Sequence, residues 1–160
     1  MLIALPSCGK TSSKTTKPTT DEPITTITTP QDDKIITEEW DETANMELTL
    51  KIDDIEVDVI WADNDSVKAL KNLAKYGLNI NMSKYGGFEQ VGSIGSALPS
   101  ADTRITTIPG DVVLYSSNQI VIFYGSNTWS YTKLGHINLS KSELTDLLGD
   151  EDVAITLSLE

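Results

Sequence analysis

The sequence predicts a mainly β fold: a closed barrel of eight strands with two short α-helices, preceded by a disordered tether. From residue 46 onward, apolar and polar residues alternate in about eight short stretches, which is the period of half-buried strands. Two further stretches have helical periodicity with start and stop signals. The first and last alternating stretches are amphipathic and can pair, which closes the sheet and removes its exposed edges.

The first elements are a hairpin and a helix. Residues 46–61, MELTLKIDDIEVDVIW, alternate on both sides of Asp53-Asp54, which predicts a β-hairpin with a two-residue turn. Residues 62–77 change period, begin with Asp and Asn residues and end at a glycine. They predict a helix of about ten residues. Its apolar face consists of Val67, Leu70 and Ala74.

The middle of the chain is richer in strands. Residues 78–83 alternate, and residues 84–100 are glycine-rich, with a short strand at Phe88–Val91. The polar, threonine-containing stretch 101–111 is interpreted as a loop. Residues 112–137 predict three strands, because apolar alternation is interrupted by Ser117-Asn118 and by 125–127.

The last helix is the best specified. Ser140 and Glu143 have the spacing of a capping box, and Leu139 and Leu144 that of a hydrophobic staple. Gly149 supplies the C-terminal stop. Residues 152–160 then alternate again and predict the closing strand.

Residues 8–45 differ in composition from the domain at 46–160. Threonine, proline and acidic residues dominate them, and their few isoleucines have no sustained period. Such a segment cannot bury enough apolar surface to offset the entropy lost on ordering. We therefore expect 8–45 to be a flexible tether.

The only cysteine, Cys8, follows a short apolar stretch. A lone cysteine is usually a small buried hydrophobe, but Gly9, Lys10 and the threonines after them offer no core. Leu5-Pro6-Ser7-Cys8 resembles the lipobox of bacterial lipoproteins, in which the chain is cut before the cysteine and the cysteine is acylated. We expect 1–7 to be the remnant of a trimmed signal peptide and Cys8 the lipidation site. The alternative is a short leader without this function.

The lipobox resemblance implies a partner and a location. The partner is a membrane, reached through the lipid anchor. The first acidic residue after the cysteine is Asp21, which in such lipoproteins favours an outer-membrane protein facing the periplasm, with surface exposure left open. The formal net charge is −12, and a field of this sign repels phosphate backbones, so nucleic acid is not expected as a partner.

The stretch 110–137 carries a set of motif elements. They are Gly110-Asp111 before a strand, Leu114-Tyr115, Ile120–Tyr124, Ser130-Tyr131, and Leu134-Gly135 before Ile137. In this order they resemble the small bacterial cyclophilin-like domains, and the order of elements fits from Met46 to Leu159. The resemblance implies a closed eight-stranded barrel with two helices. True cyclophilins isomerise prolyl bonds with an arginine on a Phe-His-Arg stretch and a later Gln-Gly-Gly-Asp stretch, and neither is present here.

No catalytic residue is therefore carried over from the family, and no cofactor or metal site is expected. His136 is the only histidine and is interpreted as structural or exposed. Arg104 is the only arginine; it either pairs with a structural carboxylate or holds a ligand in a groove on the side of the barrel. The candidate groove residues are Tyr85, Phe88, Arg104, Tyr124 and Trp129.

These observations favour a cell-envelope lipoprotein whose cyclophilin-like domain is a non-catalytic module that binds a peptide or small ligand. Two alternatives remain open. One is a divergent peptidyl-prolyl cis-trans isomerase that uses Arg104, and the other is a structural envelope protein.

Overall fold

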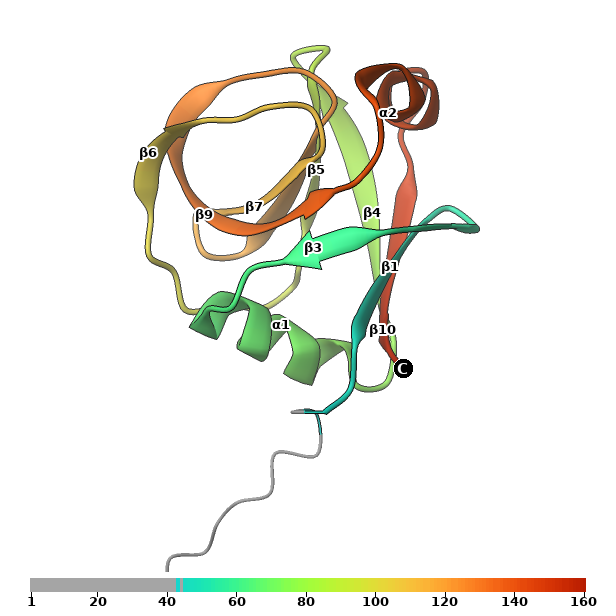
Figure 1. The fold of residues 1–160 in the computed structure, drawn as a ribbon. Helices are drawn as coiled ribbons and strands as arrows, with labels where there is room; N and C mark the ends of the chain where they lie inside the picture. Colours follow the sequence, from blue (N-terminus) through green and yellow to red (C-terminus); the bar gives the residue numbers. More distant parts are fainter. Residues whose placement is uncertain (1–42, 44) are drawn as a thin grey trace, which may run out of the picture. The chain divides into compact units, whose positions relative to one another are not determined.

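The computed structural model describes Thr43 and residues 45–160 (Figure 1). Cys8 and all but two residues of the expected tether lie outside the described residues. The described part contains ten strands and two α-helices. They are β1 (Leu48–Ile52), β2 (Ile55–Val57), β3 (Val59–Trp61), α1 (Asp65–Ala74), β4 (Leu78–Tyr85), β5 (Glu89–Ser93), β6 (Thr103–Thr106), β7 (Asp111–Tyr115), β8 (Gln119–Phe123), β9 (Thr128–Ile137), α2 (Lys141–Leu148) and β10 (Ala154–Leu159).

The strands form a nearly closed antiparallel barrel. The order around the sheet is β2-β1-β10-β4-β5-β8-β7-β9-β3, and β6 pairs with β9 outside this path. The first and last strands pair as predicted, from Leu48 opposite Leu159 to Ile52 opposite Ile155. Only Asp58 separates β2 from β3, so this stretch is one bent strand that pairs first with β1 and then with β9. With the bent strand counted once and β6 set aside, the barrel has the predicted eight strands.

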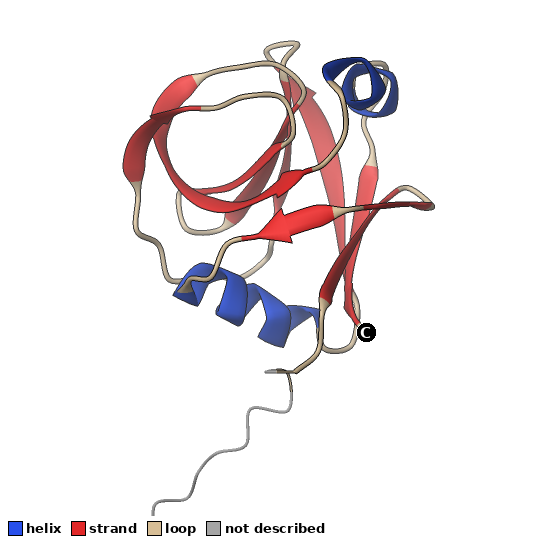
Figure 2. Cartoon of the chain, in the orientation of Figure 1, coloured by secondary structure: helices blue, strands red, loops and turns tan. Residues whose placement is uncertain are grey.

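The main core fills the barrel. It contains the inward residues of β1, β4, β7, β8 and β10, together with apolar residues of both helices. The two helices lie on opposite sides of the barrel in the view of Figure 2. α1 buries Val67, Leu70 and Ala74, which confirms the predicted face. α2 buries Leu144 and Leu148.

Local sequence signals fix the helix ends. The Asn64 side chain accepts a hydrogen bond from the Val67 backbone N–H at 2.9 Å and starts α1. Ser140 and Glu143 form the predicted capping box of α2. None of the helices in the described part is long and apolar enough to cross a membrane.

The prediction of a loop over residues 101–111 was wrong in part, because Thr103–Thr106 form β6. This strand has no apolar period: only Ile105 is half-buried, and its neighbours are exposed. β6 pairs with the first half of β9, where Thr103 lies opposite Tyr131 and Ile105 opposite Trp129. β7 pairs only with the second half of β9. β6 and the first half of β9 therefore arch away from the barrel wall (Figure 1).

Candidate functional site

A cavity of about 330 Å³ lies on the outer face of the barrel wall, beside this arch. We call it the outer cavity. Its lining residues are Tyr85, Glu89, Val91, Tyr115, Gln119, Val121, Asn127, Trp129 and Tyr131. Side chains alternate between the two faces of a strand, so Glu89 and Val91 of β5 point out of the barrel, while Gln90 points into it.

The outer cavity rests on a second, smaller apolar cluster. This cluster contains Val113, Val121, Phe123 and Tyr131, all buried. The Phe123 and Tyr131 rings meet edge to face at a centroid distance of 5.7 Å, and Tyr131 meets Tyr115 in the same way at 5.9 Å. Edge-to-face pairs add to the stability gained from burial alone. The aromatic floor of the outer cavity is therefore held in a fixed arrangement.

Among the described residues that line the outer cavity, Glu89 is the only charged one. Glu89 is 6% exposed, and its Oε2 has no hydrogen-bond partner among the residues that the structure describes. Burial raises the pKa of Glu89 from 4.5 to about 7. The charged carboxylate is disfavoured because no cation or hydrogen-bond donor in the described part of the chain compensates the lost hydration.

The pKa values of two tyrosine hydroxyls are also raised, in part by the charge of Glu89. Burial raises the pKa of Tyr131, and the negative charge of Glu89 raises it further. The same two causes, in the same order, raise the pKa of Tyr124. Both hydroxyls therefore stay protonated at neutral pH and can act as neutral polar groups near Glu89.

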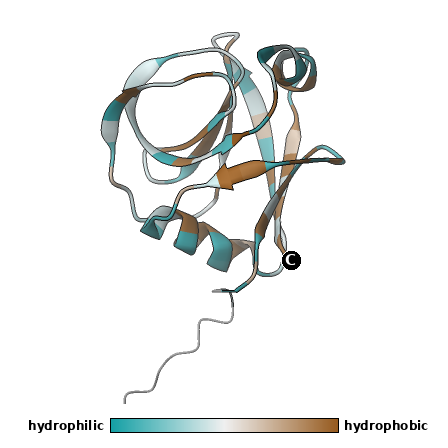
Figure 3. Cartoon of the chain, viewed as in Figure 1, coloured by the Kyte–Doolittle hydropathy of each residue, from teal (hydrophilic) through white to brown (hydrophobic). Residues whose placement is uncertain are grey.

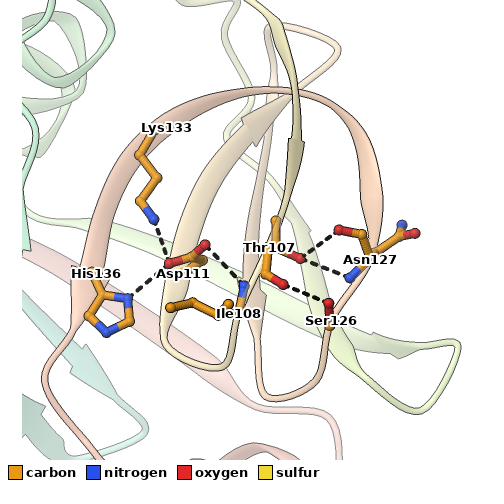
Figure 4. A network of polar contacts seen from close by, with 7 residues as sticks. All are labelled: Thr107, Ile108, Asp111, Ser126, Asn127, Lys133 and His136. Carbon is orange, nitrogen blue, oxygen red and sulfur yellow. Dashed lines mark hydrogen bonds and ion pairs between the residues drawn. The ribbon is translucent and has the colours of Figure 1, made fainter.

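A hydrogen-bond network holds the Asn127 edge of the outer cavity (Figure 4). The buried Thr107 donates through Oγ1 to the Asn127 carbonyl at 3.1 Å, and the Asn127 backbone N–H donates back to Oγ1 at 2.9 Å. The Ser126 hydroxyl donates to the Thr107 carbonyl at 2.6 Å. The Asn127 side chain in turn donates to the Tyr131 hydroxyl at 3.0 Å. The polar rim of the outer cavity is thus connected to a buried anchor.

A second group of polar contacts, also drawn in Figure 4, joins β7 to β9. Asp111 is buried and accepts a hydrogen bond from the Ile108 backbone N–H at 3.1 Å. Its other oxygen forms an ion pair with Lys133 and lies 2.9 Å from Nδ1 of His136. These contacts fall where the register between β7 and β9 shifts, at Val112/Val113. His136 therefore has a structural contact, in line with its interpretation from the sequence.

The model of the Cyclophilin-like family matches residues 50–160, which is most of the chain and nearly all of the described barrel. The chain belongs to the cyclophilin-like family. No curated protein matches it. A solved structure described as "Structure of McbB in complex with tryptophan" is similar with a TM-score of 0.49 and 9% identity. The match covers 70% of this chain and 44% of that chain, so this chain spans less than half of its length.

The cyclophilin-like barrel brings two of the five candidate groove residues together. Tyr85 and Trp129 both line the outer cavity, and both are exposed, at 66% and 53%, so they form its rim. Phe88 does not line it. Its ring is half-buried and stacks on Phe123 at 6.5 Å, in the second cluster.

The other two candidates lie elsewhere in the cyclophilin-like domain. Arg104 is exposed and lies opposite Ser130. Because Trp129 and Tyr131 are one residue away on either side of Ser130, Arg104 is on the other face of the β6–β9 ribbon from the outer cavity. No described carboxylate forms an ion pair with Arg104. Tyr124 is 6% exposed and belongs to the barrel core. Phe123 and Tyr124 point to opposite faces of the barrel wall, and both are buried.

Sequence analysis did not single out Glu89, although it directly follows the candidate groove residue Phe88. The only available signal was an acidic residue that alternates with Val91 on a short strand, directly after Phe88. Gln119 and Asn127 gave no signal, because polar residues next to turns are common. In the described part of the chain, no group of three or more histidine, cysteine or acidic residues could hold a metal ion.

Proposed function

We propose that this cyclophilin-like domain is a non-catalytic binding module and that the outer cavity is its ligand site. The observation that supports this most is the buried carboxyl of Glu89, which lies without a partner among aromatic side chains. Such a group destabilises the fold, so its presence in a cavity of ligand size is best explained by binding.

The runner-up function, a divergent prolyl isomerase, has less support. It requires Arg104 to lie in an apolar groove, where its guanidinium can hydrogen-bond the prolyl nitrogen as conjugation is lost. The exposed position of Arg104 on the opposite face of the β6–β9 ribbon does not meet this requirement. A catalytic group misplaced by about 1 Å can already lose about a hundredfold in rate.

The binding site can be tested with 2-phenylethanol, a small neutral aromatic probe, added to the ¹⁵N-labelled full chain. We expect amide resonances of the strands that line the outer cavity to shift, and Trp129→Ala to weaken the effect. Tyr76→Ala, which removes an aromatic side chain that is 90% exposed and outside the outer cavity, is the matched control. Shifts confined to other surfaces would count against this site.

We also propose that the module is anchored in the outer membrane through Cys8, facing the periplasm. The support is the lipobox-like Leu5-Pro6-Ser7-Cys8 and the absence of an acid before Asp21. With a complete signal peptide, the protein should incorporate radiolabelled palmitate, and Cys8→Ser should abolish the label. Label that survives the substitution would exclude this anchor. Removal of the domain from intact cells by external protease would exclude the periplasmic orientation.

A further inference from the structure

We propose that the outer cavity binds a small organic ammonium ion, with N–H groups on an apolar body, and that Glu89 is its counter-ion. This inference rests on the proposed function, because it assigns a ligand class to the same site. Its basis is the combination of one buried carboxylate, aromatic walls and the absence of any basic side chain in the lining.

The first step is the unmet hydrogen-bonding demand of Glu89. Its Oε2 is buried without a partner, and no described side chain donates to the carboxyl. An ionised carboxylate accepts hydrogen bonds only. The missing partner must therefore donate protons, and an ammonium group supplies both the donors and the opposite charge.

The second step is the aromatic lining. Tyr85, Tyr115, Trp129 and Tyr131 surround the space in front of Glu89. The faces of aromatic rings attract cations, most strongly where water is excluded. The rings and the methyl groups of Val91 and Val121 also provide apolar surface for the body of the ligand. A volume of about 330 Å³ suits a compact molecule of this kind.

The third step is the charge of the whole chain. A net charge of −12 favours the approach of cations to the protein over that of anions. An anionic ligand would also have to lie beside the unpaired carboxylate of Glu89. A neutral ligand that accepts a hydrogen bond from the carboxyl group would bind the protonated form of Glu89 more tightly than the ionised form. A cationic ligand should therefore bind more tightly as pH rises, and a neutral ligand that accepts a hydrogen bond should bind more tightly as pH falls.

Binding should follow the ionisation of Glu89. Its pKa of about 7 in the free protein arises from burial. The titratable groups beside it in the outer cavity are Tyr85 from β4, Tyr115 from β7 and Tyr131 from β9, and its charge also acts on Tyr124, which follows β8. Only deprotonated Glu89 attracts the cation, so affinity should fall about 30-fold between pH 8 and pH 5.5. Binding should release a proton below pH 7.

The test compares four probes by calorimetry and NMR on the full chain. Phenethylammonium is the expected ligand type, and 2-phenylethanol is its neutral analogue. Tetramethylammonium has the charge without N–H donors, and 3-phenylpropanoate reverses the charge. At pH 8 we expect phenethylammonium to bind most tightly and 3-phenylpropanoate not to bind.

The decisive variant is Glu89→Gln, which keeps the shape of the side chain and removes its charge. We expect it to weaken phenethylammonium binding about 10- to 100-fold, the range of a hydrogen bond to a charged group, and to change 2-phenylethanol binding far less, because that probe has no charge to lose its counter-ion. Asp146→Asn removes the same charge from an exposed site on α2 and should change neither affinity.

The outcomes separate the two proposals. If 2-phenylethanol binds in the outer cavity but phenethylammonium binds no better, or binds equally well to Glu89→Gln, the ligand class is wrong and the binding site stands. If no probe shifts resonances of the outer cavity at millimolar concentration, both proposals are wrong. A normal amide spectrum of the variant ensures that loss of binding does not reflect unfolding.

Discussion

Glu89→Gln should stabilise the free protein, and by more at high pH than at low pH. The sign follows from the pKa, which burial raises from 4.5 to about 7. Between these two values the folded state holds a proton that the unfolded state has released, so stability falls as pH rises through this window. Glutamine at this position does not titrate and removes that contribution.

The magnitude follows from the same two values. A shift of about 2.5 units corresponds to about 3 kcal/mol once Glu89 is ionised in both states. At pH 5 Glu89 is largely ionised in the unfolded state alone, and the destabilisation is only about 1 kcal/mol. The difference in unfolding free energy between Glu89→Gln and the wild type should therefore grow by about 2–3 kcal/mol from pH 5 to pH 8. The glutamine amide keeps some burial cost of its own, so this growth is more informative than the absolute difference.

Urea denaturation at pH 5, 6, 7 and 8, followed by tryptophan fluorescence, measures this quantity. All other titrating groups are shared by the two proteins and cancel in the difference. Because Oε2 of Glu89 has no partner to lose, the substitution breaks no hydrogen bond. A difference that stays constant across the four pH values would refute the reasoning, since it would mean that Glu89 is ionised at little cost in the folded state.

Three further predictions concern other parts of the barrel. Asp111→Asn should lower the unfolding free energy by about 1–2 kcal/mol, because it removes the charge between Lys133 and His136. Thermal unfolding measures this loss, and an unchanged midpoint would contradict the structural role of Asp111. Gln90→Leu should lower the unfolding free energy by about 1–2 kcal/mol and speed hydrogen exchange at the end of α2, because the Gln90 amide donates to the Leu148 and Glu151 carbonyls. Unchanged exchange would mean that these two hydrogen bonds do not hold the end of α2. The wild type should not accelerate isomerisation of an Xaa-Pro peptide. If it did, and if Arg104→Ala abolished this activity, the isomerase function would be favoured again.

The sequence was informative wherever one period governed a whole element. The alternation in β1 and β10 was clear enough to predict that they pair, and this pairing is present. The capping box of α2 was readable because it depends on two side chains at a fixed spacing. Such features are local, so neighbouring residues contain the information needed to recognise them.

The remaining features depend on contacts between distant segments. β6 is a strand because the exposed half of β9 offers it hydrogen-bonding partners, and its own residues show no strand period. The bend at Asp58 lies where the chain changes partner, from β1, which precedes it closely, to β9, which follows about 70 residues later. β3 is hydrophobic along its length (Figure 3), yet Ile60 is 66% exposed. The outer cavity likewise combines residues from five strands and a loop, which no single stretch could indicate.

The pairing of β1 with β10 extends beyond the strands themselves. The Glu47 N–H donates to the Glu160 carbonyl at 2.8 Å, and the Glu160 N–H donates to the Glu47 carbonyl at 3.0 Å. The two ends of the barrel sequence are therefore directly opposite each other. A linker of a few residues could join them, and the chain could be reopened at an exposed turn elsewhere in the barrel. The order of elements around the barrel is thus circular, and a circularly permuted chain should fold to the same barrel.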